Sequence, residues 1–459
     1  MTTVPTDDRY DFPLNDAQKT LLQRQSAVPS VPLNVANYVV LEGRLDAARF
    51  LDALRDEVRV GRAAQITLRT YAFGTSGVYD PTLHDFVEDI DLRNEEDPFG
   101  SALDMMREDV CKPVDPFVDR LARGILFELS STRFVLFQRT HHIVTDGLGA
   151  VNYMIRGLAR IGEILDGSPD VSVPTIPDLR APARADAGYR ASRRFKTDRD
   201  YWRAMLDGVG GGTPSPSVRV GPPSAINRRV SASIPAATMA TLRCAAEERT
   251  TTLPALIATT LAAYFARTTD SDDVVIDLAV AARTVAALRN TPLPTLNFVP
   301  VRTGVGSATA VGDALRSTQS ALMGALRHQR YRRDDIVADH GSPITGPVLN
   351  IMMFERKIQF GEVTATFHSL TTGPVDDLSL NIYPDTDGDP SVDGSLVVEL
   401  EANPNRYDDA DVVEHHRQIV ALVGEVASAL VNGGEVAVDD LPMVVEEPAA
   451  VSTRAGRGC

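Results

Sequence analysis

Cysteine is scarce in this chain of 459 residues, which holds only three. Cys111, Cys244 and Cys459 lie far apart and form no CxxC spacing. Because zinc sites and disulfide frameworks need closely spaced or numerous cysteines, the sequence predicts neither. So few thiols are typical of a protein that stays in a reducing compartment, and we expect a cytoplasmic location.

Long apolar runs are missing as well. No stretch approaches the roughly 18 uninterrupted apolar residues that a membrane-spanning helix needs. The N-terminal sequence MTTVPTDDRYDFPLNDAQ has neither the basic nor the apolar part of a secretory signal. We therefore expect no membrane partner.

An excess of positive charge is also absent, because the formal net charge is −16. Nucleic-acid binding needs a clustered basic surface, so we expect no nucleic-acid partner. Two local basic segments remain, at 189–199 and 327–333. They are either ordinary solvated surfaces or docking sites for an acidic partner, and the sequence leaves both interpretations open.

The chain does contain alternating helix and strand patterns, which predict an α/β or α+β class. Its length favours two domains, and the Pro-, Asp- and Ser-rich segment 166–185 predicts the boundary. The Gly/Pro-rich segment 207–224 predicts a loop and lacks the GxGxxG pattern of a phosphate site. Helices are predicted at 14–25, 45–59, 148–165 and 408–431, and strands at 35–43, 65–73, 133–140, 273–281, 295–302, 348–355 and 395–402.

The motif HHIVTDG, at 141–147, joins the apolar strand 133–140 to the helix that follows. Neighbouring residues on a strand point to opposite sides, so His141 and His142 are poorly placed to bind one metal ion. No third ligand stands nearby in the sequence, and we expect no metal site.

Two interpretations of the histidines remain. In the structural one, both are hydrogen-bonded core residues, Asp146 caps the helix that begins at Leu148, and Gly147 gives the chain room to turn. In the functional one, an imidazole projects into a cleft at the end of the strand and accepts a proton at neutral pH. The chain has no GxSxG elbow, so the expected chemistry is direct attack of one substrate on another.

The motif resembles the HHxxxDG signature of the condensation-domain superfamily, which includes the amide-forming condensation domains of nonribosomal peptide synthetases and related acyltransferases. The resemblance extends along most of the chain. The further matching segments are PLNDAQKTLLQRQ (13–25), DRDYWRAML (198–206), NFVPVR (297–302), RHQRY (327–331), GPVLNIMMFE (346–355) and the closing LVVELEANPNRYDDADVVEHHRQIVALV.

The fold that this resemblance implies is a V-shaped pseudodimer of two chloramphenicol-acetyltransferase-like halves with a central tunnel. We expect the first half to span 1–175 and the second 176–459, with a crossing loop near 283–302. The implied roles of single residues are a catalytic His142 facing the tunnel, a buried structural His141, an ion pair of Asp146 with Arg283, free space beside the thioester at Gly147, and substrate binding at Asn297.

The implied reaction joins an acyl thioester to a small-molecule amine or alcohol in natural-product biosynthesis. The thioester is carried on the phosphopantetheine arm of an acyl or peptidyl carrier protein, and the chain itself binds no cofactor. CoA-dependent acyl transfer within the same superfamily is the alternative. Residues 58–73 and 283–296 depart from the family pattern, so ester formation is kept beside amide formation.

The resemblance also bears on assembly. The chain contains no adenylation or carrier segment, and we expect a free-standing enzyme. An acidic carrier protein would need a local basic surface on this acidic chain. The first predicted docking cluster is Arg190, Arg193, Arg194 and Lys196, and the second is Arg327, Arg330, Arg332 and Arg333.

Overall fold

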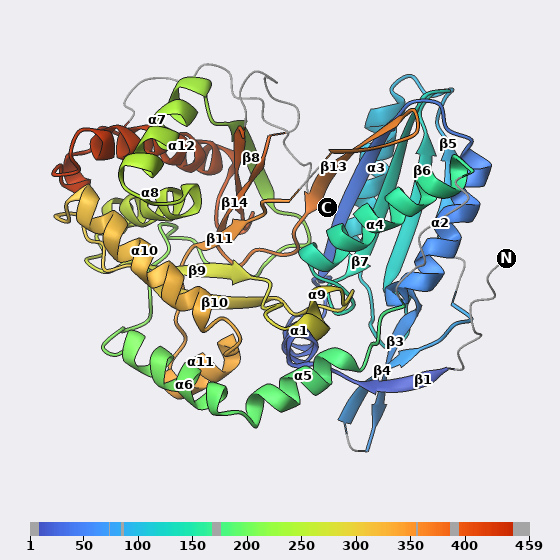
Figure 1. Cartoon of the computed structure of the whole chain (residues 1–459), viewed down its shortest axis with the longest axis horizontal. Coiled ribbons are helices and arrows are strands. Elements are labelled where there is room, and N and C mark those ends of the chain that lie inside the picture. The colour runs from blue at the N-terminus through green and yellow to red at the C-terminus, as the bar shows by residue number, and fades with distance from the viewer. Residues whose placement is uncertain are drawn as a thin grey trace.

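The computed structural model describes residues 9–72, 74–83, 87–167, 176–354, 357–385 and 394–443. These residues form two lobes, and each lobe is built on a six-stranded sheet with helices packed against it (Figure 1). The alternation of helix and strand patterns in the sequence thus produces a mixed α/β fold.

The sheet of the first lobe is covered on both faces. Helices α2 (Ala47–Gly61) and α4 (Gly147–Leu165) pack on one face, and α3 (Pro98–Cys111) packs on the other. This burial explains the continuous apolar run before the histidines, since alternate side chains enter two different cores. The strand order is β12 (Lys357–Phe360), β13 (Val363–Thr371), β2 (Asn34–Glu42), β7 (Arg133–His141), β6 (Ala122–Glu128) and β5 (Val87–Asp91).

Two strands of this sheet come from the second half of the chain. β13 pairs antiparallel with β2, with Phe367 opposite Val39, and β12 pairs with β13. The predicted boundary segment is 166–185, and its residues 168–175, which include the proposed division, lie outside the described residues. The division of the chain at residue 175 therefore stays a prediction. The topology shows in addition that residues 357–371, from the second half of the chain, complete the sheet of the first lobe.

The second lobe has one apolar and one polar sheet face. Helices α7 (Ala236–Glu248), α8 (Leu253–Thr268), α10 (Val311–Arg327) and α12 (Asp409–Val431) belong to the core on the apolar face. Asp277, Asn350 and Ser379 line the space between the lobes. The strand order is β10 (Asn297–Arg302), β9 (Val275–Val280), β11 (Val348–Ile351), β14 (Leu378–Pro384), β15 (Leu396–Ala402) and β8 (Arg228–Ser233).

Most predicted elements are present within a few residues of their expected bounds. Helix α1 (Asp16–Ala27) begins after a capping box at Asn15, and α2 begins after the predicted cap Asp46. Residues 207–224, all described, contain no helix or strand, as the loop prediction required. The ends of two predicted strands, Phe73 and Glu355, lie outside the described residues.

The smaller elements lie outside the two six-stranded sheets. A three-stranded sheet has the order β1 (Tyr10–Pro13), β4 (Gly74–Tyr79) and β3 (Ile66–Tyr71). Helices α5 (Ala181–Arg190) and α6 (Arg193–Met205) lead into the second lobe, where α11 (Arg333–His340) follows α10.

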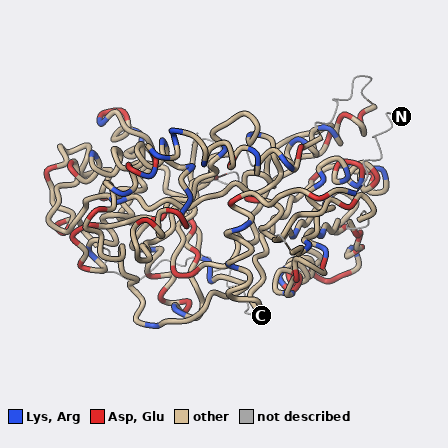
Figure 2. The backbone as a smooth tube through the Cα atoms, turned by 90° about the horizontal axis from the view of Figure 1, so that it is seen from below, with Lys and Arg blue, Asp and Glu red and all other residues tan. Residues whose placement is uncertain are grey.

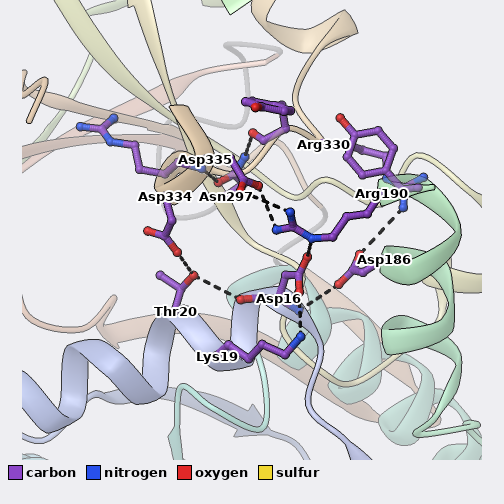
Figure 3. A network of polar contacts seen from close by, with 12 residues as sticks. Asp16, Lys19, Thr20, Asp186, Arg190, Asn297, Arg330, Asp334 and Asp335 are labelled. Carbon is purple, nitrogen blue, oxygen red and sulfur yellow. Dashed lines mark hydrogen bonds and ion pairs between the residues drawn. The ribbon is translucent and has the colours of Figure 1, made fainter. Parts of the chain in front are cut away.

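A polar network joins α1 to the second lobe (Figure 3). Arg190 binds Asp16 on α1 through Nε (2.7 Å) and Asp335 on α11 through Nη2 (2.9 Å). Thr20 also hydrogen-bonds Asp334. One arginine between two carboxylates therefore ties three separate helices together.

Candidate active site

His141 is the last residue of β7, His142 follows it, and backbone contacts hold both. The His141 N–H donates to the Leu121 carbonyl, and the His142 N–H donates to the Leu33 carbonyl, both at 2.7 Å. Their side chains take opposite directions, as neighbouring strand residues do. His141 is fully buried, whereas His142 is half-buried and lines the cavity between the lobes.

His141 is a structural residue in this arrangement. Its Nδ1 accepts from the Ile143 N–H (3.2 Å), so its Nε2 donates to Oε1 of Gln25 (3.1 Å). Burial, together with the neighbouring His142 and Arg139, lowers the pKa of His141 to about 3. The ring is therefore neutral, and it anchors α1 against the motif.

His142 is arranged to accept a proton. Its Nδ1 lies 2.7 Å from the Thr145 carbonyl oxygen and must donate to it, which leaves Nε2 unprotonated. Burial lowers the pKa of His142 below its ordinary value, although the Thr145 hydrogen bond and the Asp146 charge oppose this effect. The imidazole is thus neutral at pH 7, and its basic nitrogen is the one not bound to the loop.

Asp146 shapes the motif loop and is itself buried. Its Oδ1 accepts from the Gly149 N–H (2.7 Å), which caps α4, and from Arg283 Nη2 (2.6 Å). Its Oδ2 accepts from the backbone N–H groups of Thr295 (2.8 Å) and Leu296 (3.2 Å). The predicted ion pair with Arg283 is present, and the crossing loop lies against the motif.

Gly147 provides the open space beside His142 that was predicted for it. The residue is exposed and lines the cavity, and a Cβ added there would meet no atom within 4 Å. Any side chain at this position would project into that space. The first turn of α4 therefore leaves room for a reacting group next to the imidazole.

The cavity that these residues face has a volume of about 770 Å³. One wall belongs to the first lobe and contains His142, Gly147 and the apolar side chains of α4. The other wall is the polar sheet face of the second lobe. Such a volume is within the range of pockets that hold small-molecule ligands.

Asn297 does not line the cavity among the described residues. Its side-chain amide donates to the carbonyls of Gln329 (2.9 Å) and Tyr331 (2.8 Å), and its oxygen accepts from the Arg333 N–H (3.1 Å). Because both ends of the amide are bound to the backbone of 329–333, the structure gives Asn297 a positioning role. Substrate binding by Asn297 stays a prediction that these contacts do not support.

Sequence reasoning missed the segment 372–377, which connects β13 to β14 and lines the cavity beside His142. A Cβ on Gly373 would lie 3.8 Å from Cδ2 of His142. Asn227 fixes the segment with two hydrogen bonds, to the Gly373 carbonyl (2.9 Å) and from the Val375 N–H (3.2 Å). No local pattern in the sequence marks Asn227, since its partners lie almost 150 residues away.

Arg24 was also missed, although it lies in the segment 13–25 that carries the resemblance. Its Nη2 donates to the Pro374 carbonyl (3.1 Å) and to Oδ1 of Asp376 (3.0 Å). Its positive charge lowers the pKa of His142 further. Arg24 therefore places a cation in the same cavity as the histidine.

The two predicted basic clusters are largely engaged within the chain. Arg194 binds Asp198 through Nε (2.7 Å), and Arg330 lies 4.3 Å over the Tyr189 ring. Arg332 is half-buried and donates to the Leu296 carbonyl (2.7 Å), and Arg333 binds Asp277. Arg190 takes part in the network of Figure 3, and the exposed members of the two clusters are Arg190, Arg193, Arg194, Lys196 and Arg327.

The distribution of charge marks no second site in the described part of the chain. Acidic and basic residues are interleaved over both lobes (Figure 2). Within the described ranges, no three His, Cys, Asp or Glu side chains gather closely enough to hold a metal ion. In the same ranges, no helix combines the length and the apolar character needed to cross a bilayer.

The comparison with known families decides what this site belongs to. The family model of the condensation domain matches residues 9–434. The chain belongs to the condensation-domain family. Condensation domains transfer acyl or peptidyl groups, form amide bonds and work with thioesters bound to carrier proteins.

Curated relatives of this condensation domain include a nonribosomal peptide synthase. The dimodular nonribosomal peptide synthase of Bacillus subtilis (strain 168) is 29% identical over 93% of this chain and 18% of its own length. The isonitrile lipopeptide synthase of Streptomyces coeruleorubidus is 29% identical over 91% of this chain and 28% of its own length. Enterobactin synthase component F of Escherichia coli (strain K12) is 28% identical over 89% of this chain and 32% of its own length. The chain thus spans less than a third of the length of these relatives.

The fold agrees with solved condensation domains. The first condensation domain of the calcium-dependent antibiotic synthetase, in complex with substrate analogue 3a, has a TM-score of 0.84 and 25% identity, with 95% of this chain and 99% of that chain covered. The predicted pair of chloramphenicol-acetyltransferase-like lobes is thereby confirmed.

Proposed function

We propose that this condensation domain joins an acyl group, carried as a thioester on the phosphopantetheine arm of a carrier protein, to a small amine or alcohol. The product is an amide or an ester. The observation that carries the proposal is the unprotonated Nε2 of His142, which belongs to a ring that lines a cavity of about 770 Å³ beside the open space at Gly147.

The chemistry needs one proton acceptor. The acceptor nitrogen or oxygen attacks the thioester carbonyl, its proton passes to Nε2 of His142, and the carbon–sulfur bond breaks as the new bond forms. The proton then passes to the leaving sulfur, so charges and electrons balance. A neutral imidazole is suited to this role at neutral pH.

Much of the rate is expected to come from holding the two substrates together. Thioesters are already activated, and a well-oriented pair reacts far faster than free molecules in solution. The cavity between the lobes has walls from both halves of the chain, and it can receive a donor and an acceptor at once. The phosphopantetheine arm belongs to the partner and serves here as part of the substrate.

The test is to incubate the protein with acylated carrier proteins and candidate amines and alcohols, and to identify products by mass. We expect a new amide or ester whose yield depends on the carrier and saturates with it. Efficient turnover of acyl-CoA without a carrier would instead assign the protein to CoA-dependent acyl transfer. Hydrolysis alone, with no acceptor incorporated, would contradict both reactions.

A further inference from the structure

An apolar track runs along α4 away from the reaction site. Leu148, Val151 and Met154 all line the cavity between the lobes, at the three-residue spacing that places side chains on one side of a helix. From Gly147 to Met154 the helix rises about 10 Å. An extended alkyl chain of roughly eight carbons has a similar length, given carbon–carbon bonds of about 1.5 Å.

Met154 separates this track from a second, inner cavity. The inner cavity has a volume of about 50 Å³ and lies between α4, α2 and the sheet of the first lobe. Met154 lines both cavities and is buried. A methionine side chain is flexible and adapts to irregular space, so it can move aside for a ligand. The apolar side chains that line the inner cavity include Leu54, Val58, Leu136, Leu158 and Ile161.

Gly157 lies in the interior of α4, and packing does not explain why a glycine stands there. A Cβ on Gly149 would lie 2.8 Å from the Pro292 carbonyl oxygen, and one on Gly162 would lie 2.5 Å from Phe360 Cβ. A Cβ on Gly157 would meet only Glu57 Cβ, at 4.0 Å. A glycine inside a helix costs about 0.5–1 kcal/mol relative to alanine. Because Gly157 lines the inner cavity, its effect is to keep that space open.

The charged and hydroxyl groups that reach the inner cavity have partners. Glu57 pairs with Arg160, and the Tyr153 hydroxyl donates to the Glu57 backbone carbonyl. Arg123 binds Glu88 at 2.9 Å. The further polar member of the wall is the uncharged amide of Gln138. A ligand entering this space therefore meets mostly hydrocarbon, which favours an alkyl group over a charged or polar side chain.

We propose that the donor acyl group of this condensation domain is a linear aliphatic chain, which lies along α4 and, when long, displaces Met154 to enter the inner cavity. This inference rests on the proposed acyl transfer at His142. Each methylene group that is removed from water adds about 0.8 kcal/mol of transfer free energy, or nearly fourfold in kcat/KM. The gain should continue until the chain reaches the end of the inner cavity.

The experiment measures kcat/KM for linear acyl thioesters of pantetheine, from acetyl to palmitoyl, with one acceptor. In the parent protein we expect kcat/KM to rise by about threefold to fourfold per methylene up to medium length. Met154→Ala should shift the optimum toward longer chains. Gly157→Leu should abolish the gain for chains that reach past Met154.

Matched controls separate the cavity from general effects on the fold. Gly188→Leu places the same substitution at an exposed position of α5 with no atom within 4 Å, and Met323→Ala truncates a methionine that is 46% exposed on α10. Both should keep the parent profile. The melting temperatures of all variants show whether Gly157→Leu is folded. Gly157→Ala is a smaller substitution at the same position, for the case that Gly157→Leu does not fold.

Binding without turnover keeps the two proposals distinguishable. Calorimetric titration with S-alkyl pantetheine thioethers, which cannot be hydrolysed, should show the same dependence of affinity on chain length. The affinities should also respond in the same way to Met154→Ala and Gly157→Leu. A flat profile in both assays, with acetyl transferred as well as longer chains, would overturn the alkyl-chain inference alone. Absence of any transfer, with normal length-dependent binding, would overturn the proposed reaction instead.

Discussion

At the scale of single residues, His142 and His141 show how one dipeptide serves two purposes. Replacing His142 by alanine should lower turnover by roughly 10²-fold, the lower end of what general acid–base catalysis contributes, because the thioester is already activated. An alcohol acceptor should suffer more than an amine. Turnover is read from product mass and the fold from the melting temperature, with His142→Gln as a size-matched control. Unchanged turnover on the true substrate pair would refute the role as a base.

The pKa of His142 gives the same residue a pH signature. Activity needs the neutral ring, and burial lowers the pKa of His142 below its usual value of about 6.5. We therefore expect kcat/KM to be constant above this pH and to fall only at lower pH, as the ring becomes protonated. A pH profile of kcat/KM checks this, and a fall in activity that begins above pH 7 would contradict it.

The burial of His141 makes the free energy of unfolding depend on pH. Its pKa is about 3 when folded and about 6.5 when unfolded, so the unfolded chain binds one more proton between these values. As pH falls through that window, His141 should reduce the free energy of unfolding by up to about 1.4 kcal/mol per pH unit. Urea unfolding at pH 7 and pH 4.5 should show a smaller acid loss for His141→Gln than for the parent protein.

Asp146 belongs to the same scale but has a different function. It receives hydrogen bonds from two lobes, and its removal strands the buried charge of Arg283. Asp146→Ala should therefore cost about 3–5 kcal/mol of stability, seen as a lower melting temperature. If the variant is inactive but as stable as the parent, Asp146 takes part in the chemistry. Arg283→Met, which removes the other partner, is the matched comparison.

At the scale of elements, the segment 372–377 depends on Asn227. Removing both of its hydrogen bonds in Asn227→Ala leaves a buried carbonyl and a buried N–H unpaired, at a cost of about 1–3 kcal/mol each. Because the segment lies beside His142, we expect kcat to fall while the pH profile keeps its shape. Asn227→Asp restores only the contact to the Val375 N–H and should recover part of the loss. Unchanged kcat in Asn227→Ala would remove its positioning role.

The helices and strands differ in how well the sequence could predict them. The helices α1, α2 and α4 were predictable because their caps and apolar spacing are local. The pairing of β13 with β2 was not, since an alternating strand does not specify which sheet it joins. The ion pair of Asp146 with Arg283 came from the family resemblance, because nothing local connects residues 137 positions apart. The ion pairs of Arg190 were not predictable either, because its carboxylate partners lie 174 and 145 positions away.

At the scale of the whole molecule, the net charge of −16 makes long-range attraction to an acidic carrier protein unfavourable. Docking must then use a local surface. Arg193, Lys196 and Arg327 are exposed, and the Arg194 hydrogen bond to the Arg327 carbonyl brings α6 and α10 together there. Reversing these three charges to glutamate should raise KM for an acyl carrier protein and reduce its salt dependence.

The control for this docking prediction reverses three arginines of α2, on the outer side of the first lobe: Arg49, Arg55 and Arg59. That variant should keep the parent KM. A pantetheine thioester, which needs no docking, should react equally well with both variants. Equal losses for the carrier and the pantetheine thioester would place the defect in the cavity or the fold.

The return of β12 and β13 to the first lobe has a consequence for synthesis on the ribosome. The edge of β2 gains its partner only when residue 371 has been made, 329 positions after β2 ends at Glu42. At about 5–20 residues per second, this edge stays unpaired for roughly 15–65 seconds. An unpaired strand edge is a site of aggregation, so the nascent first lobe should need a chaperone until β13 has been made.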